Sequence, residues 1–261
     1  MLKDVLNFNA LWPGHGPRGY RERFFRNKSE NLFFGSFDSF AAAQAAIPSK
    51  IPVGYDNVDA ATKLYSPQVC EWDYPALYWI ADAFAGGMTS VFDLGGHVGI
   101  KYYAFRRVVR YPQGLRWTVC DVASVARAGE DLARQQDALA ELAFCTDLRQ
   151  ASGVDLLFIS GSLQYLPTTM KEILQALEVR PRRIILNTTA VHERRTMFTL
   201  NSIGYGVCPY RTQHHEEVFR EIREAGYRRR DMWRNDSKPI RIPFVEGGDA
   251  AYYVGCCFDR T

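Results

Sequence analysis

A glycine-rich turn after a short apolar run is the feature that most constrains this chain. The run Val91-Phe92-Asp93-Leu94 breaks at Gly95-Gly96-His97-Val98-Gly99 and leads into a segment compatible with a helix. Glycine at such a strand-to-helix turn permits positive φ and lets a ligand approach the backbone closely. The first turn of the following helix offers unpaired N–H groups to the same ligand. The turn therefore predicts a ligand site at the carboxyl end of the first strand of an open α/β sheet.

Strand-like and helix-like segments alternate after this turn. Apolar runs typical of buried strands are separated by segments of helical length, and each of the first three runs ends in an acidic residue. Such alternation favours parallel pairing with helices on both faces of the sheet. The pattern predicts a doubly wound, mainly parallel, seven-stranded α/β sheet. The predicted strands are Ser90–Leu94, Arg116–Asp121, Leu142–Asp147, Val154–Ser160, Arg183–Asn187, Tyr227–Trp233 and Ala250–Phe258, and the predicted helices are Tyr102–Arg110, Ser124–Leu139, Thr168–Leu177 and His214–Ala225.

The first 85 residues have a different texture. They are rich in aromatic residues and interrupted by prolines, with no strand-like alternation. Two segments, Ser39–Ala46 and Asp73–Phe84, have the composition and capping residues of helices. We therefore expect residues 1–85 to form a lid or substrate-shaping extension and residues 86–261 to form the α/β domain.

Composition limits the classes of function. The net charge of +3 is too small to indicate a nucleic-acid partner. No apolar run reaches the roughly 20 residues of a membrane span, and the first residues lack the core of a signal peptide. The 6 cysteines show neither a Cys-x-x-Cys pair nor a cysteine–histidine spacing, which predicts reduced thiols and no metal site. We expect a cytoplasmic protein; the sequence leaves its oligomeric state open.

The ordered set of motifs resembles the class I S-adenosylmethionine-dependent methyltransferases over roughly residues 88–258. The family pattern is hydrophobic-x-Asp-x-Gly-x-Gly-x-Gly, and Asp93, Gly95 and Gly99 match it while His97 replaces the middle glycine. The Asp-x-Gly-Gly-x-x-Gly form is more similar to a bacterial group of methyltransferases often associated with surface-polysaccharide gene clusters. That likeness extends to Gly54-Tyr55-Asp56, to Gln164-Tyr165-Leu166 and to the stretch from Gly226 to Trp233.

The resemblance implies S-adenosylmethionine as the cosubstrate and S-adenosylhomocysteine (SAH) as its product. Asp93, Gly95, Gly96 and Gly99 would face the methionine part of the cosubstrate. His97 stands where glycine is usual, so its side chain would narrow the methionine pocket or add a polar contact there. Loss of cosubstrate binding at this turn is an alternative consequence of the same substitution.

The remaining cosubstrate contacts come from later strand ends. The resemblance places Asp121 at the ribose hydroxyls, and a carboxylate with two acceptor oxygens suits a vicinal diol. Asp147, with the backbone of Leu148, would meet the adenine amine. Ser160 and Gly161 would lie beside the sulfonium and the amino group. Each acid has an alternative role as a helix cap or as a solvated strand end.

Methyl transfer to oxygen generally needs a group that accepts the acceptor's proton. His192 follows the fifth predicted strand near the open edge of the expected cleft, and we take it as the base, with His214 and His215 as alternatives. Tyr165, in the loop after the fourth strand, is expected to orient the acceptor. As a core aromatic residue it would serve packing instead.

Aromatic residues outside the predicted sheet are candidates for the acceptor wall. Trp12, Tyr20 and Trp72 of the extension, with Tyr205 and Tyr210 after the fifth strand, offer faces that suit sugar rings and small organic molecules. Together with the resemblance, they favour methylation of a hydroxyl on a glycan or a related small metabolite.

The sequence leaves two other classes of function open. A nicotinamide-dependent oxidoreductase also uses a glycine turn and an acid after the second strand. However, no tyrosine is followed four residues later by lysine, and the turn lacks the full G-x-G-x-x-G register. A non-catalytic binding protein that keeps only the fold is the other alternative, since a fold does not by itself establish a function.

Overall fold

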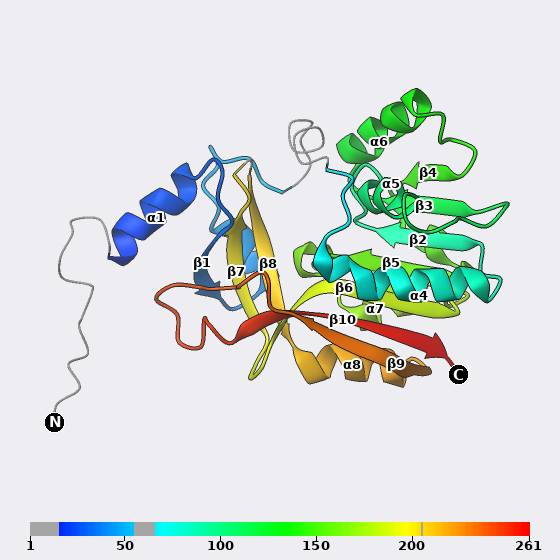
Figure 1. Cartoon of the computed structure of the whole chain (residues 1–261). Coiled ribbons are helices and arrows are strands. Elements are labelled where there is room, and N and C mark those ends of the chain that lie inside the picture. The colour runs from blue at the N-terminus through cyan, green and yellow to red at the C-terminus, as the bar shows by residue number, and fades with distance from the viewer. Residues whose placement is uncertain (1–15, 55–65, 205) are drawn as a thin grey trace.

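The computed structural model describes residues 16–54, 66–204 and 206–261, which form two lobes (Figure 1). The larger lobe is an α/β sheet with helices on both faces, and the smaller is built on three antiparallel strands. The helices are α1 (Pro17–Arg26), α2 (Phe40–Ala45), α4 (Tyr74–Ala85), α5 (Ile100–Phe105), α6 (Ala123–Gln135), α7 (Met170–Gln175) and α8 (His215–Glu224), with short 3-10 helices η2 (Glu71–Asp73), η3 (Leu148–Ala151) and η4 (Leu163–Tyr165). The strands are β1 (Leu32–Phe37), β2 (Ser90–Leu94), β3 (Arg116–Cys120), β4 (Leu142–Cys145), β5 (Leu156–Ser160), β6 (Arg183–His192), β7 (Met197–Ser202), β8 (Val207–His214), β9 (Tyr227–Asn235) and β10 (Ala251–Arg260).

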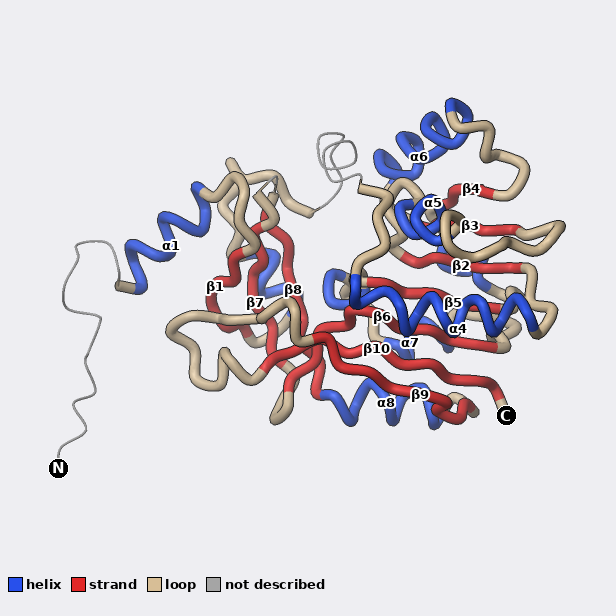
Figure 2. The backbone as a smooth tube through the Cα atoms, in the orientation of Figure 1, coloured by secondary structure: helices blue, strands red, loops and turns tan. Residues whose placement is uncertain are grey.

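The larger lobe confirms the predicted doubly wound arrangement. Its strands lie in the order β4-β3-β2-β5-β6-β10-β9, parallel from β4 to β6, with β10 antiparallel to both of its neighbours. One apolar core packs α7 and α8 against the sheet, and a second packs α4 and α5 against the other face. The tube trace shows the two helical layers enclosing these strands (Figure 2).

The sheet is nevertheless larger than the seven strands expected. β1, β7 and β8 pair antiparallel with one another, and β8 joins the end of β6 through the pairs Val191↔Gln213 and His192↔His214. The result is one sheet of ten strands. β6 continues five residues beyond the predicted end at Asn187, and this extension pairs with β10 and, at its last two residues, with β8.

The N-terminal extension contains a strand that its sequence does not predict. Leu32–Phe37 forms β1 and pairs with β7, although we expected no strand before residue 86. Its sequence shows no apolar–polar alternation because both faces of the strand are covered: Phe33 packs against Tyr210, and the neighbouring Phe34 packs against Phe24. The two predicted helices of this region are confirmed as α2 and α4, and the Ser39 hydroxyl caps α2 by accepting a hydrogen bond from the Ala42 N–H at 3.0 Å.

A bend in β6 carries the chain from one lobe to the other. Thr188 adopts a φ of +50°, and the register of the β6–β10 pair shifts opposite it, between Val254 and Cys256. The first half of β6 thus belongs to the α/β sheet and the second half to the antiparallel lobe. The bend lies directly after the carboxyl end of β5, so the two lobes meet at the edge where the ligand site is predicted.

None of the helices within the described residues is long and apolar enough to cross a membrane.

Candidate functional site

A cavity of about 620 Å³ lies where the two lobes meet. This volume is within the range of about 300–1,000 Å³ usual for small-molecule sites. One wall is formed by the carboxyl ends of β2, β3 and β5, and the facing wall by α2, the segment that follows α2, and β8. The described lining residues are Phe40, Gln44, Val53, Gly54, Gly95, His97, Ile100, Asp121, Val122, Ser160, Gly161, Ser162, Tyr165, Leu166, Pro167, Cys208, Pro209 and Lys238.

The cavity collects about half of the site residues predicted from the sequence. Those that line it are Gly95, His97, Asp121, Ser160, Gly161 and Tyr165. Those outside its lining are Asp93, Gly96, Gly99, Asp147, Leu148 and His192. A more open hollow of about 700 Å³, beside Phe84, Tyr111 and Glu141, lies at the opposite end of the strands and contains no predicted site residue.

The glycine turn fits the strand-to-helix geometry expected of it. The N–H of Gly95 donates to the carbonyl of Cys120 at 2.7 Å, which ties the end of β2 to β3. Gly95 has a φ of +73°, and a Cβ added there would lie 2.3 Å from the Cβ of Ser162. Gly99 also has a positive φ, of +83°, at the start of α5. Both positions therefore require glycine for conformation, and Gly95 requires it for space as well.

Asp121 holds this turn in place. Its Oδ2 accepts a hydrogen bond from the backbone N–H of His97 at 2.9 Å, and its Oδ1 accepts one from the N–H of Val122 at 2.8 Å. His97 itself has a φ of +60°, a conformation uncommon for a residue other than glycine. The side chain thus supports the turn, and its carboxylate, with acceptors on both oxygens, also lines the cavity.

Asp93 does not face the cavity, contrary to our expectation. Successive residues of a strand point to opposite faces, and Asp93 projects with Val91 into the aromatic core on the α5 side. Its Oδ2 accepts a hydrogen bond from the Trp117 indole at 3.2 Å, and its Oδ1 has no hydrogen-bond partner among the described residues. Burial raises the pKa of the carboxyl to about 7, and the nearby Asp121 charge adds to the rise.

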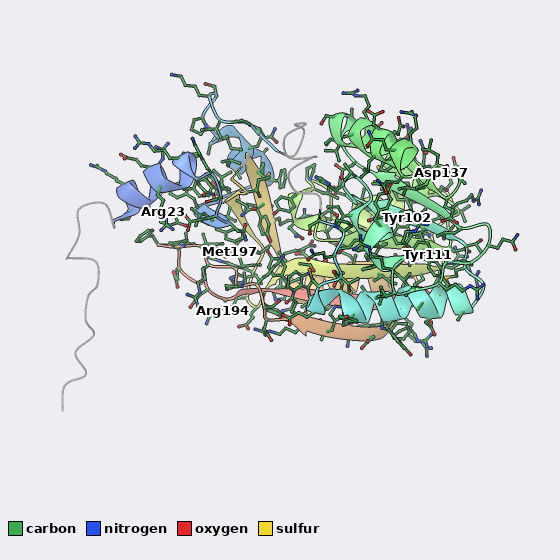
Figure 3. All side chains as sticks on the ribbon, turned by 45° about the horizontal axis from the view of Figure 1, so that its top comes forward. Arg23, Tyr102, Tyr111, Asp137, Arg194 and Met197 are labelled. Atoms are coloured by element: carbon green, nitrogen blue, oxygen red, sulfur yellow. The ribbon has the colours of Figure 1, made fainter. Side chains whose placement is uncertain are left out.

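Gly96 is required because of Asp93. A Cβ at Gly96 would lie 2.4 Å from the Cγ of Asp93. The Asp93 carboxyl therefore leaves no room for a side chain at position 96. Around this carboxyl lies an aromatic core that includes Tyr102 and Tyr111, which lie close together in the larger lobe (Figure 3).

The loop after β5 forms the adjoining part of the wall made by the strand ends. The N–H of Gly161 donates to the carbonyl of Asn187 at 2.9 Å, and the Asn187 amide donates to the Ser160 hydroxyl at 3.2 Å. Gly161 has a φ of +76°, and a Cβ added there would meet no heavy atom within 4 Å. The wall of the cavity is therefore bare backbone at this point.

Gln164 supports this loop, a role that sequence reasoning did not assign. Its buried side-chain amide donates to the carbonyl of Gly161 at 2.8 Å, and its oxygen accepts from the N–H of Ala190 at 3.4 Å. It thereby connects the loop after β5 to the second half of β6. Tyr165 also lines the cavity, and its hydroxyl donates to the Oδ1 of Asn201 at 2.8 Å.

Asp147 and Leu148 are not brought to the cavity. Asp147 follows β4 and caps the short helix η3: its carboxylate accepts a hydrogen bond from the Arg149 N–H at 2.9 Å and forms an ion pair with the Arg149 guanidinium at 2.8 Å. That guanidinium lowers the pKa of the Asp147 carboxyl. Of the two roles open to this acid, the structure supports the cap.

His192 is not placed to act as the base. Its Nδ1 accepts hydrogen bonds from the backbone N–H groups of Arg194 and Arg195 at 3.0 and 3.2 Å, so the proton resides on Nε2, which donates to the carbonyl of Gly247 at 2.9 Å. The residue is 1% exposed and outside the cavity lining. Figure 3 shows Arg194 and Met197 together in the smaller lobe, on the far side from Tyr102.

The alternatives His214 and His215 also lie outside the lining; their rings stack on each other at the start of α8. Among the described residues His97 is thus the histidine that lines the cavity. The expected catalytic use of a histidine after the fifth strand has no geometric support.

The predicted aromatic wall is formed by other residues. The Tyr20 hydroxyl donates a hydrogen bond to the Phe33 carbonyl at 3.0 Å. Tyr210 is a core residue whose hydroxyl is hydrogen-bonded to the Tyr253 hydroxyl at 2.9 Å. Trp72 lies behind Lys238 rather than in the lining itself. Trp12 and Tyr205 fall outside the described residues. Phe40 and Tyr165 supply the aromatic surface instead.

Comparison with known proteins identifies the fold. No family model matches the sequence, and a comparison with curated proteins found no match. Among solved structures, the chain is similar to the "putative sarcosine dimethylglycine methyltransferase" of Galdieria sulphuraria, with a TM-score of 0.52 and 11% identity over 72% of this chain and 86% of that one.

Two further structures have comparable similarity. The N-terminal domain of EvdMO1, solved with SAH and D-fucose, has a TM-score of 0.51 and 13% identity over 74% of this chain and 84% of that one. OxaC, solved with SAH and oxaline, has a TM-score of 0.50 and 16% identity over 79% of this chain, which spans 52% of OxaC. The chain has the methyltransferase-like α/β fold.

Proposed function

We propose that this chain is an S-adenosylmethionine-dependent methyltransferase that methylates a small organic molecule at a hydroxyl oxygen. The observation that supports this function is a single cavity with two unlike walls. The wall formed by the strand ends carries Gly95, Asp121 and Gly161, where the family resemblance places the cosubstrate. The facing wall comes from α2 and β8, outside the seven-stranded unit, and suits a second molecule.

The residues of the first wall fit the cosubstrate chemically. The backbone is bare at Gly161, where a Cβ would enter open space, and this permits a ligand to approach closely. Asp121 presents carboxylate acceptors of the kind that a ribose diol requires. The strand ends of such sheets are where ligands of doubly wound folds bind. His97 is accommodated because Asp121 holds its backbone, so the departure from glycine leaves the turn intact.

The second wall is mainly apolar. Phe40, Val53 and Pro209, with Leu166, Pro167 and Cys208, surround the acceptor end, and the Gln44 amide is the polar side chain from α2. Burial raises the pKa of the Cys208 thiol to about 12, which keeps it neutral. This surface favours a hydroxyl compound with an apolar face. A single sugar ring meets that description, whereas the lining holds few polar groups for an extended glycan.

Methyl transfer from S-adenosylmethionine requires no covalent intermediate with the protein. The cosubstrate supplies a methyl group already activated on a sulfonium, so alignment and exclusion of water provide much of the rate enhancement. The two walls can align donor and acceptor because they meet across one cavity, whose shape is fixed by the bend of β6 and by Gln164. We assign no proton acceptor, since His192 is committed to backbone hydrogen bonds.

Calorimetric titration tests the proposal. The protein is titrated separately with S-adenosylmethionine, SAH, NAD⁺ and NADP⁺. Binding of the first two alone is the expected result. Binding of a dinucleotide alone would point to an oxidoreductase, and binding of none of the four would leave a non-catalytic protein that keeps only the fold. Once SAH binding is established, a panel of hydroxyl compounds with transfer of labelled methyl as the readout identifies the acceptor class.

A further inference from the structure

The charged side chains of the cavity lining are few. Among the described lining residues, Asp121 carries the carboxylate and Lys238 the ammonium group. Asp121 is already assigned to the ribose. A cosubstrate that carries an α-amino acid also brings a carboxylate, and burying that group without a cationic partner would be costly.

Lys238 reaches the cavity from an unexpected part of the chain. It belongs to the connection between β9 and β10, which crosses over the smaller lobe before it returns (Figure 1). This connection is anchored: Ile240 and Ile242 are buried in the core of that lobe, and the Gly247 carbonyl accepts the hydrogen bond from His192. Lys238 is thus held at the beginning of a fixed segment.

The surroundings of Lys238 belong to the cosubstrate half of the cavity. Its Nζ lies over the Trp72 ring, 4.4 Å from the ring centroid. The next residue, Asp73, is fully buried and accepts a hydrogen bond from Lys101 at 2.6 Å, where α5 follows the glycine turn. Asp73 also accepts from the Asn187 amide at 3.1 Å, and that amide donates to Ser160. Lys238 is therefore placed on the side of the glycine turn and Ser160.

We propose, on the basis of the proposed function, that Lys238 binds the α-carboxylate of S-adenosylmethionine. The Trp72 face holds the head of the lysine, and Lys238 lines the cavity on the side where the methionine part would lie. The opposite wall, formed by α2 and β8, is mainly apolar. Its described lining residues include no cation that could bind a carboxylate in place of Lys238.

The electrostatic surroundings of Lys238 suit the binding of an anion. Lys238 is an exposed residue, yet the protein atoms around its ammonium displace enough water to lower the pKa of the group, and the charge of Lys101 lowers it further. Asp73 acts in the opposite direction, but both of its oxygens are committed to Asn187, Lys101 and the Cys70 N–H. No described carboxylate forms an ion pair with Lys238. A ligand carboxylate would supply the missing negative charge.

The test separates the carboxylate from the rest of the ligand. SAH is compared with S-adenosyl-3-thiopropylamine, which keeps the adenosine, the sulfur and the amine but lacks the carboxylate. Binding to the wild-type protein and to Lys238→Met is measured by calorimetry, with competition against SAH for weak ligands. Methionine preserves an unbranched stem on Trp72. Lys238→Arg keeps the charge, and Lys171→Met removes a lysine that lies outside the cavity.

The wild type is expected to bind SAH about tenfold or more tightly than the decarboxylated analogue, the effect of a hydrogen bond to a charged group. Lys238→Met should lose this preference by weakening SAH alone, Lys238→Arg should retain most of it, and Lys171→Met should retain all of it. Equal weakening of both ligands in Lys238→Met would overturn the proposal in favour of a structural role. An unchanged preference would overturn it too. Failure of the wild type to bind SAH would instead reject the proposed function, and this inference with it.

Discussion

The carboxylate of Asp121 accepts the backbone N–H of His97 at 2.9 Å, so the acid at the end of one strand fixes the turn that follows its neighbour. This bond joins two residues that the sequence presents as separate motifs 24 positions apart. It also explains why a histidine is tolerated where the methyltransferases that the sequence resembles have glycine. The backbone of His97 takes the left-handed conformation that glycine would supply, and the carboxylate holds it there.

Asp121→Asn should weaken SAH binding about 10- to 150-fold, corresponding to about 1.5–3 kcal/mol for hydrogen bonds to a charged group. The amide keeps the shape of the side chain but has one acceptor oxygen in place of two, so it cannot serve both the turn and a diol. Calorimetry measures the affinity, and thermal unfolding checks that the variant is folded.

Asp147→Asn is the matched control for this change. Asp147 also ends a strand, yet its carboxylate is bound by Arg149 outside the cavity. SAH affinity should remain at the wild-type value. If Asp147→Asn weakened SAH and Asp121→Asn did not, the adenosine would lie further along the sheet than we propose.

Gly161→Ala should block the cosubstrate. Gly161 has a φ of +76° and lines the cavity, so the added methyl meets open space in the protein but occupies room that the ligand needs. Gly153→Ala is a matched variant, because Gly153 has a φ of +79°, no heavy atom within 4 Å of an added Cβ, and a position outside the cavity.

Both alanine variants should lose about 1 kcal/mol of stability or somewhat more, because alanine is strained at positive φ. SAH affinity should fall in Gly161→Ala and remain unchanged in Gly153→Ala. Denaturant unfolding and calorimetry report the two effects separately. Equal affinities in the two variants would place the ligand away from the loop after β5.

The α/β half of the fold was predictable because its signals are local. Each strand from β2 to β5 is a short, mainly apolar run bounded by turn residues. The strands β1, β7 and β8 were not predictable in the same way. Leu32–Phe37 has no alternation and becomes a strand only by pairing with residues 197–202, far along the chain.

The site residues likewise divide into those with a local sequence signal and those placed only by the tertiary fold. Asp121, Ser160 and Gly161 stand at strand ends, and the topology of a parallel sheet brings such ends to one edge. Lys238 reaches that edge through the folding of a long connection, which leaves no local signal. The sequence does not indicate the surroundings of His192, because its contacts with Gly247 and with two backbone N–H groups exist only in the folded chain.

His192→Ala should destabilise the protein without acting through a proton transfer. The change leaves the N–H groups of Arg194 and Arg195 and the Gly247 carbonyl without their buried partner, which costs about 2–4 kcal/mol. Arg194→Ala is the control, because it keeps the backbone N–H that His192 binds and should shift stability by about 0.5 kcal/mol at most. Urea unfolding measures both. Wild-type stability in His192→Ala would show that the connection 236–250 does not depend on this contact.

Asp93 should make the stability of the fold depend on pH. Its folded-state pKa of about 7 lies above the usual value of an aspartate, so the folded protein holds this proton more tightly than the unfolded chain does. The contribution of Asp93 to stability is therefore fully present below about pH 4 and decreases by up to about 1.4 kcal/mol per pH unit as the pH rises towards 7. The variant Asp93→Asn tests this dependence, because its side chain cannot ionise.

The free energy of unfolding of the variant minus that of the wild type should rise with pH between about 4 and 7 and level off above that range. Subtraction removes the contributions of the other titrating groups that both proteins share. Urea unfolding at intervals of half a pH unit measures this difference, and a difference that stays constant from pH 4 to pH 8 would show that the Asp93 carboxyl titrates in the folded protein as it does in the unfolded chain.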